Sequence, residues 1–396
     1  MTKPKHPHPS PVDGAKKTRR GYIEGFYGRL LTWDDRHRIL HHLNFLAMTD
    51  YFYAPKEDPQ HRFQWRAPYD DHWRRSFQHF TSQARAYNIT VSAGLAPGID
   101  FDFTGLDVRQ GDYAILLDKA RQMIKDGADE IGLLMDDIDP GFPGHAGGFD
   151  HEGTAHTALA NALAEDIDVP LHLTPRIYAD IIKDDGRYLT HMTRHLNPSV
   201  QVMTCGHHII AANTALSDTK IVQAGMAEDR LMVWDNLYAH DYCPRRLFLG
   251  AYIGRHDHQD IMLNPTGLVE TDRLLLSLMA AGPDQWHATL KAHDVPDAFL
   301  DVAASFWLPP HRDLDDTAAA MGVQPPTADR FDMMAESLDQ LLWRWKSPLQ
   351  REWYPFLMGL RQDILLHRGV MSTRRISKTY PPLMATLLHP HAKPKT

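Results

Sequence analysis

The segment from Ile131 to Asp139 reads IGLLMDDID, an apolar run that passes abruptly into carboxylates. Short apolar runs between turn signals are typical of strands that are buried on both faces of a parallel sheet. The same pattern returns along the chain after residue 20 and predicts eight strands. These are expected at Gly21–Phe26, Thr49–Ala54, Ile89–Leu95, Glu130–Met135, Leu171–Leu173, Val200–Thr204, Leu231–Trp234 and Ile261–Leu263.

Amphipathic segments separate the predicted strands. In the segment 112–126, Leu116, Ala120 and Met123 recur at spacings of three and four residues, as apolar residues do along one face of a helix. Strands that alternate with helices predict an α/β fold, and eight such repeats are typical of a (β/α)8 TIM barrel. A doubly wound open sheet is the alternative, because the pattern does not itself prove that the sheet closes. The other helices are expected at Trp33–Leu43, Asp71–Tyr87 and Thr154–Glu165.

The strand pattern stops after Gly282. Apolar residues then follow helical spacing, first from Phe331 to Trp345 and then from Trp353 to Ile364. We therefore expect a small all-α domain after the barrel, with the aromatic residues in its core. The predicted division is a disordered tail at residues 1–18, the barrel at 19–282, the helical domain at 283–385 and a second disordered tail at 386–396.

Composition narrows the function classes. The formal net charge of -8 over 396 residues is modest, and both signs are interspersed, which argues against a nucleic-acid or membrane-surface protein. Cys205 and Cys243 are too few for a disulfide framework. The first twenty residues contain no apolar signal-peptide core, and no apolar run is long enough to span a bilayer. A cytoplasmic protein is therefore expected.

Polar or glycine-containing clusters follow nearly every predicted strand. In a barrel the carboxyl ends of all strands meet at one mouth, where catalytic groups gather. A single cluster of this kind is better explained as an ordinary loop start, but eight in succession favour a shared site. The clusters are Glu24-Gly25, Tyr53 to Lys56, Pro97-Gly98, Asp136-Asp137, Arg176 to Tyr178, Gly206-His207, Asp235-Asn236 and Asn264.

Asp136 and Asp137 are the most conspicuous of these residues. Two adjacent carboxylates repel each other, so the pKa of at least one is expected to rise unless a cation intervenes, and a raised pKa suits a general acid. Neighbouring side chains on a strand point in different directions, so the pair is poorly placed to act as acid and direct nucleophile. A substrate that supplies its own nucleophile, such as a 2-acetamido oxygen, fits better. A helix cap or turn remains open, as does a metal site that includes Asp139.

Four motifs in the order found here resemble those of glycoside hydrolase family 84. They lie at residues 21–29 (GYIEGFYGR), 53–58 (YAPKED), 133–139 (LLMDDID) and 233–236 (VWDN). Members of this family are O-GlcNAcases and related β-N-acetylglucosaminidases. The resemblance implies a (β/α)8 barrel and a retaining, substrate-assisted hydrolysis through an oxazoline intermediate, without a metal or organic cofactor. It also implies a GlcNAc-bearing glycoside, glycan or glycoprotein as the substrate.

The resemblance assigns roles position by position. Asp136 is similar to the residue that holds the acetamido N–H, and Asp137 to the general acid and base. Further positions are expected to bind the sugar. Gly25 and Lys56 match positions that contact the 3-hydroxyl side of the sugar, and Asp241 matches the carboxylate that binds the 4- and 6-hydroxyls. Asn236 and Asn264 match ligand-binding amides. Tyr178 and Trp234 match the walls of the acetamide pocket.

Two alternatives remain open. One is a protein that keeps the GlcNAc-binding pocket and has lost catalysis, which a chromogenic N-acetylglucosaminide would test. The other is a metal-dependent hydrolase, which full activity after exhaustive chelation would exclude. Its metal ligands would come from the Asp cluster together with His207, His208, His256 and His258.

Overall fold

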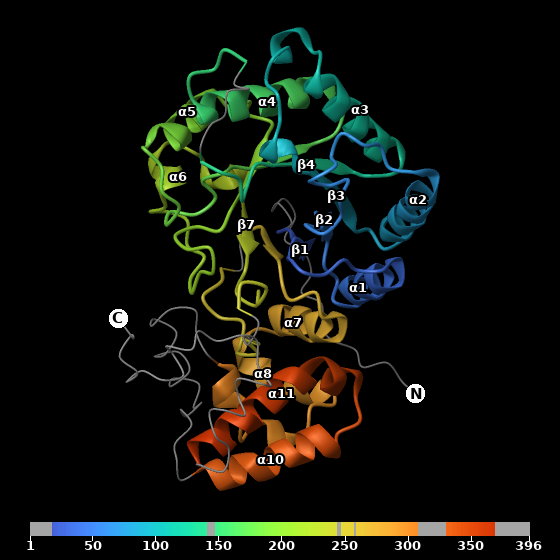
Figure 1. The fold of residues 1–396 in the computed structure, drawn as a ribbon, viewed down its shortest axis with the longest axis vertical. Helices are drawn as coiled ribbons and strands as arrows, with labels where there is room; N and C mark the ends of the chain where they lie inside the picture. The colour runs from blue at the N-terminus through green and yellow to red at the C-terminus, as the bar shows by residue number, and fades with distance from the viewer. Residues whose placement is uncertain (1–17, 141–146, 244–246, 257–258, 308–329, 369–396) are drawn as a thin grey trace, which may run out of the picture.

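The computed structural model describes residues 18–140, 147–243, 247–256, 259–307 and 330–368. The tail expected at 386–396 lies outside these residues, as do residues 1–17 of the other expected tail and residues 369–385 of the expected helical domain. Between these limits the chain forms a barrel with a group of helices beside it (Figure 1).

Eight parallel strands close into the predicted barrel. Each strand pairs with the next along the chain, and the first pairs with the last, with Arg20 opposite Ile261. This last pairing excludes the open sheet. The strands are β1 (Arg20–Glu24), β2 (Asp50–Tyr53), β3 (Thr90–Leu95), β4 (Glu130–Leu134), β5 (Leu171–Thr174), β6 (Gln201–Thr204), β7 (Leu231–Asp235) and β8 (Ile261–Leu263).

Helices cover the outside of the barrel. The first is capped at its amino end by Thr32, whose hydroxyl accepts a hydrogen bond from the Asp35 backbone N–H while the Asp35 carboxylate accepts one from the Thr32 backbone N–H. This capping box explains why the helix starts directly after the loop that follows β1. The helices of this layer are α1 (Trp33–Phe45), α2 (Asp71–Ala86), α3 (Asp112–Lys125), α4 (Glu152–Asp166), α5 (Arg187–His195), α6 (Lys220–Gln223) and α7 (Val269–Ala281).

A separate apolar cluster fills the inside of the barrel. The Phe52 and Trp234 rings meet edge to face, with 6.1 Å between centroids. Because side chains alternate along a strand, Ile23 faces this interior while its neighbour Tyr22 packs outward with the helices. The cluster forms the floor on which the residues at the barrel mouth rest.

Charged side chains close the opposite, amino-terminal end of the barrel. Arg19 donates to Asp50 at 2.8 Å through Nε and to Glu130 at 2.7 Å through Nη2. The Glu130 carboxylate also lies 2.7 Å from Nε2 of His172. This end of a TIM barrel contributes to stability rather than to chemistry.

Helices follow the barrel as predicted: α8 (Trp286–Ala292), α10 (Phe331–Trp343) and α11 (Pro348–His367). They are drawn in orange and red in Figure 1, where α8 and α11 lie next to α7 and α10 lies on the far side of them. Glu352 of α11 accepts hydrogen bonds from the backbone N–H groups of Glu270 and Thr271, at 3.0 and 2.8 Å, and so caps α7. Along the predicted stripes, Leu338 and Trp353 are fully buried. The domain boundary at residues 282 and 283 stays a prediction.

No helix in the described part of the chain is long and apolar enough to cross a membrane.

Candidate active site

A cavity of about 400 Å³ lies at the carboxyl ends of the strands. All nine residues predicted to form the site line it, although they come from loops far apart in the sequence. Apolar side chains, among them Met203 and Ile209, contribute to its wall. The nine predicted residues are Gly25, Lys56, Asp136, Asp137, Tyr178, Trp234, Asn236, Asp241 and Asn264.

Lys56 is buried and pairs with Asp136. Its Nζ lies 2.5 Å from Asp136 Oδ2, and its side chain is 2% exposed. From the residue types alone, a surface salt bridge with Glu57 or Asp58 would be the simpler interpretation of Lys56. The buried pair with Asp136 shows that Lys56 has a different partner. The second oxygen of Asp136, Oδ1, is buried and has no hydrogen-bond partner among the described residues. A buried acceptor without a partner is costly, so this atom is suited to receive an N–H or O–H from a ligand.

Asp137 follows in an unusual backbone conformation. Its φ of 53° lies in the left-handed region, which few residues other than glycine adopt, although Asp tolerates it better than most. Two tyrosine hydroxyls donate to its carboxylate at 2.8 Å, Tyr27 to Oδ2 and Tyr178 to Oδ1. Both carboxylates of the pair therefore face one cavity, despite being adjacent in the chain.

The pKa of Asp137 is lowered, whereas repulsion between adjacent acids alone would raise it. Burial acts to raise the pKa of Asp137, but the positive charge of Lys56 and the tyrosine hydrogen bonds, with Arg62 adding to them, outweigh burial and hold that pKa below its usual range. The cation that could cancel the mutual repulsion is thus present. A raised pKa is not found for Asp137 in the free chain.

Amide and indole groups form a connected wall on the other side of the cavity. Asn264 accepts from the Gly25 backbone N–H at 3.1 Å and donates to Asn236 Oδ1 at 2.9 Å. Trp234 donates its Nε1–H to the same oxygen at 3.0 Å. The Asn236 amide nitrogen donates to the Ile209 carbonyl at 2.9 Å. The Asn236 oxygen therefore already accepts two hydrogen bonds inside the protein.

Gly25 has a steric reason to be glycine. A Cβ at this position would lie 2.4 Å from the Trp234 ring, well inside van der Waals contact. Asp241 lies near the same loop, since its Oδ2 accepts from the Tyr27 backbone N–H at 2.9 Å. The loop after β1 is thereby joined to the loop after β7.

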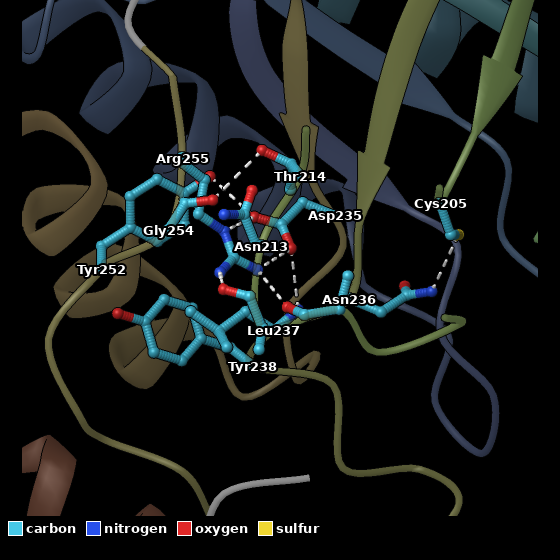
Figure 2. Close-up of polar contacts among 12 residues, drawn as sticks. Cys205, Asn213, Thr214, Asp235, Asn236, Leu237, Tyr238, Tyr252, Gly254 and Arg255 are labelled. Atoms are coloured by element: carbon cyan, nitrogen blue, oxygen red, sulfur yellow. Dashed lines mark hydrogen bonds and ion pairs between the residues drawn. The ribbon is translucent and has the colours of Figure 1, made fainter. Parts of the chain in front are cut away.

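Figure 2 shows a buried ion pair beside Asn236. Arg255 binds both oxygens of Asp235, at 2.8 Å through Nε and 2.6 Å through Nη2. The same guanidinium donates to the carbonyls of Ala211 and Ile253, and Asp235 accepts from the Leu237 backbone N–H. The pair thus fastens the loops after β6 and β7 to the end of the strand that carries Asn236.

Sequence reasoning did not select Tyr27 and Arg62. Tyr27 lies inside the first motif, and Arg62 lies six residues after Lys56, but neither residue type signals a catalytic position by itself. In the structure Arg62 donates to the Tyr27 hydroxyl and to the Asp137 backbone carbonyl. Both residues are therefore in direct contact with the candidate acid and base.

The described residues do not gather histidines around the carboxylate pair. His207 instead binds Asp180, with 2.7 Å between Nδ1 and Oδ2, and His258 lies outside the described residues. Within the described ranges, one group of three side chains is close enough to share a metal ion: His151, Asp184 and Asp185. None of the three lines the cavity. His151 Nδ1 accepts from the Gly153 N–H, so a neutral ring carries its proton on Nε2, which weakens the group as a metal site.

A (β/α)8 barrel whose mouth holds two adjacent carboxylates and a cation in one cavity is the arrangement of a glycoside hydrolase. The chain belongs to the beta-N-acetylglucosaminidase family, whose sequence model matches residues 20–288. It is 26% identical over 279 residues to the protein O-GlcNAcases of Rattus norvegicus and Mus musculus. These matches cover 67% of this chain and 30% of each relative, so the chain matches less than a third of their length.

A solved structure shares the fold. A mutant of the Thermobaculum terrenum O-GlcNAc hydrolase superposes with a TM-score of 0.72, over 90% of this chain and 84% of the other, at 19% sequence identity. The match extends beyond the family region, so the fold shared by the two proteins includes more than the barrel.

Proposed function

We propose that the chain is a retaining β-N-acetylglucosaminidase of the O-GlcNAcase type, which removes terminal β-linked GlcNAc by substrate-assisted catalysis. The observation that carries the proposal is the carboxylate pair. Asp136 and Asp137 line the same cavity, and one buried oxygen of Asp136 has no partner among the described residues. A neutral acetamido N–H is the group that such an oxygen would accept, and it leaves the neighbouring carboxyl free for proton transfer to the leaving group.

In the first step, the acetamido carbonyl oxygen of the substrate attacks C1 and the bond from C1 to the aglycone oxygen breaks. Asp137 gives its proton to the departing oxygen, and Asp136 accepts the acetamido N–H and stabilises the positive charge that develops on the oxazoline. In the second step, water attacks C1 while Asp137 takes a proton from it. As the new bond forms, the bond between C1 and the oxazoline oxygen breaks, and the acetamide is restored with overall retention at C1.

The other cavity residues fit the binding of one sugar. Lys56 and Asp241 offer charge-assisted hydrogen bonds to hydroxyl groups, and Trp234 and Tyr178 offer apolar surface to the acetamide methyl. A volume of about 400 Å³ is at the lower end of the range for ligand pockets, which favours a single terminal residue. Asn236 acts on the sugar indirectly, because its oxygen holds Trp234 while its amide nitrogen donates to the Ile209 carbonyl and to Cys205 Sγ. Asn264 holds the Gly25 backbone N–H and offers its second amide N–H to the sugar.

General acid catalysis requires Asp137 to be protonated when the substrate is bound. In the free chain the pKa of Asp137 is low because the positive charge of Lys56 and the hydrogen bonds from Tyr27 and Tyr178 outweigh the effect of burial. We infer that a bound sugar covers the carboxyl and excludes water, which raises this pKa toward neutrality. The low value in the free chain suits the second step, in which Asp137 acts as a base.

GlcNAc on serine or threonine of proteins is the substrate that the names of the relatives favour, and glycan ends carry the same sugar. A glycopeptide and a chitooligosaccharide, compared by kcat/KM, would separate these substrates. The chain would remain a β-N-acetylglucosaminidase with either result.

The proposed mechanism is tested with 4-nitrophenyl β-glycosides whose acetamide carries zero to three fluorine atoms. Fluorine withdraws electrons from the carbonyl oxygen, so kcat/KM is expected to fall steeply with each one. The 4-nitrophenyl β-glucoside, which has no acetamide, is expected to be inert. A flat fluorine series would contradict substrate assistance, and binding of GlcNAc without any turnover would indicate a binding protein. Loss of activity with a chelator would favour the metal-dependent alternative.

A further inference from the structure

The loop after β2 brings a second cation to the carboxylate pair. Arg62 follows Lys56 by six residues and is 7% exposed. Whereas Lys56 binds the Asp136 side chain, Arg62 binds the backbone of Asp137: its Nη2 donates to the Asp137 carbonyl oxygen at 2.7 Å. Its other terminal nitrogen, Nη1, donates to the Tyr27 hydroxyl at 2.5 Å.

The backbone at Asp137 determines where the carboxyl points. Side chains alternate along a strand, so continued extended backbone beyond β4 would turn Asp136 and Asp137 to opposite sides. The left-handed conformation of Asp137, with φ of 53°, interrupts this alternation, and both side chains line one cavity. A strained conformation of this kind persists where surrounding contacts hold it in place.

The same guanidinium also fixes the side chain of Asp137. The hydroxyl of Tyr27 accepts from Arg62 and donates to Asp137 Oδ2 at 2.8 Å. This leaves the tyrosine proton one direction in which to point, toward the carboxylate. Arg62 therefore acts on Asp137 twice, through the main-chain carbonyl and through Tyr27. A planar guanidinium can hold two acceptors at a fixed spacing, which a lysine ammonium cannot reproduce.

We propose that Arg62 is a positioning residue for proton transfer by Asp137, holding the left-handed peptide and the tyrosine that together aim the carboxyl at the leaving oxygen. This inference rests on the proposed function, because it assumes that Asp137 is the general acid and base. Arg62 itself is not among the residues that line the cavity.

The test compares Arg62→Met and Arg62→Lys with the wild type on aryl N-acetylglucosaminides of graded leaving-group ability. General acid catalysis contributes about 10²- to 10⁴-fold, and a misaimed acid is expected to lose part of that, roughly 10- to 100-fold in kcat, on the poorest leaving group. An activated aryl glycoside needs little protonation, so its kcat is expected to change only a few-fold. KM is expected to change little with either substrate. Arg62→Lys keeps one of the two contacts at most, so its kcat on the poorest leaving group is expected to lie between those of the wild type and Arg62→Met.

Two further measurements separate positioning from a structural role. Arg85→Met removes a surface arginine of α2 and is the matched control, expected to leave both the melting temperature and the leaving-group dependence unchanged. Tyr27→Phe, alone and with Arg62→Lys, completes a double-mutant cycle. Because the two residues act on Asp137 as one chain of hydrogen bonds, their effects on the poor leaving group are expected to be strongly non-additive.

Equal losses for all leaving groups would overturn the inference, as would strictly additive effects of Tyr27→Phe and Arg62→Lys. If Arg62→Met does not fold, the leaving-group dependence of Arg62→Lys and the double-mutant cycle with Tyr27→Phe still test the inference. Failure of the proposed function would look different, because the wild type itself would then not turn over any N-acetylglucosaminide.

Discussion

Lys56, in the loop after β2, and Asp136, directly after β4, form a buried ion pair in which Nζ lies 2.5 Å from Oδ2. The ion pair thus links the carboxyl ends of β2 and β4, which are separated by β3 in the barrel. The pair leaves one oxygen of Asp136 without a partner among the described residues, and that oxygen is the one we assign to the substrate. A cation held here also explains how two adjacent carboxylates coexist in a cavity.

Lys56→Met is expected to lower both activity and stability. Loss of a hydrogen bond to a charged group costs about 1.5–3 kcal/mol, so kcat/KM for an aryl N-acetylglucosaminide is expected to fall roughly 10- to 150-fold. The free energy of unfolding is expected to fall by about 3 kcal/mol or more, because the Asp136 carboxylate stays buried without its cation. Steady-state kinetics and urea unfolding measure the two effects. Lys125→Met, on the exposed side of α3, is the control, and unchanged activity in Lys56→Met would refute the assignment of Lys56.

Gly25→Ala tests the close approach of the loop after β1 to Trp234. The added Cβ would lie 2.4 Å from the ring, so the indole must move and its hydrogen bond to Asn236 is expected to break. Overpacking of this kind costs about 1–3 kcal/mol in stability, and we expect kcat/KM to drop at least tenfold. Gly28→Ala, three residues away with nothing within 4 Å of the new Cβ, carries only the cost of its positive φ. Equal activity of the two variants would show that the Trp234 position is not critical.

Arg255→Met is expected to destabilise the chain strongly. Its partner Asp235 is 1% exposed and would keep a buried charge without compensation, at a cost of about 3–5 kcal/mol in the free energy of unfolding. Because the pair also fastens the loops beside Asn236, KM for the sugar is expected to rise. Arg361→Met removes an arginine from a far more exposed pair, with Asp339, and is expected to cost less than about 1 kcal/mol. Similar unfolding midpoints for the two variants would count against this account.

Acid is expected to destabilise the fold below about pH 6.5. Burial lowers the pKa of His156 to about 3, whereas an unfolded histidine titrates near 6.5. Between these values only the unfolded state binds the proton, so stability is complete above the unfolded pKa and falls as the pH drops. One such histidine accounts for roughly 2 kcal/mol between pH 6.5 and 5, since each pH unit contributes about 1.4 kcal/mol. Burial also lowers the pKa values of His42 and His61, so these residues add to the loss of stability per pH unit.

The histidine effect is measured as urea unfolding of the wild type and His156→Gln from pH 8 to pH 5. The variant is expected to be less stable at pH 8 because packing is lost, but to lose less stability on acidification. His72→Gln, at an exposed position of α2, is expected to keep the wild-type slope. A wild-type slope in His156→Gln would show that this histidine is already protonated in the folded chain.

The sequence predicted the fold closely because each strand ends where apolar residues give way to polar ones. The expected and observed limits of β8 coincide, and those of β4 differ by one residue. The helical stripe from Phe331 to Trp345 was assigned to the core for the same reason, and Leu338 and Leu341 are fully buried there. Local periodicity carries this information, since it reports which face of each element is covered.

The site was predicted only in part. The nine predicted residues came from four motifs and, for Tyr178, Asp241 and Asn264, from the family resemblance outside them, but their mutual contacts depend on tertiary structure. Nothing local to Asp137 signals a left-handed backbone, and nothing local to Arg62 signals that it reaches the Asp137 carbonyl. The raised pKa expected for adjacent acids was not found at Asp137, because the cation that offsets it comes from Lys56, 81 positions earlier in the chain.

The central claim is that Asp136 and Asp137 have different tasks, one serving the acetamide and the other the leaving oxygen. The most direct measurement is kcat/KM of Asp136→Ala and Asp137→Ala across aryl N-acetylglucosaminides of graded leaving-group ability. Asp137→Ala is expected to lose about 10²- to 10⁴-fold on poor leaving groups and far less on activated ones, which need little protonation. Asp136→Ala is expected to lose a similar factor on all of them. If the two variants showed the same dependence on the leaving group, the division of roles would be wrong.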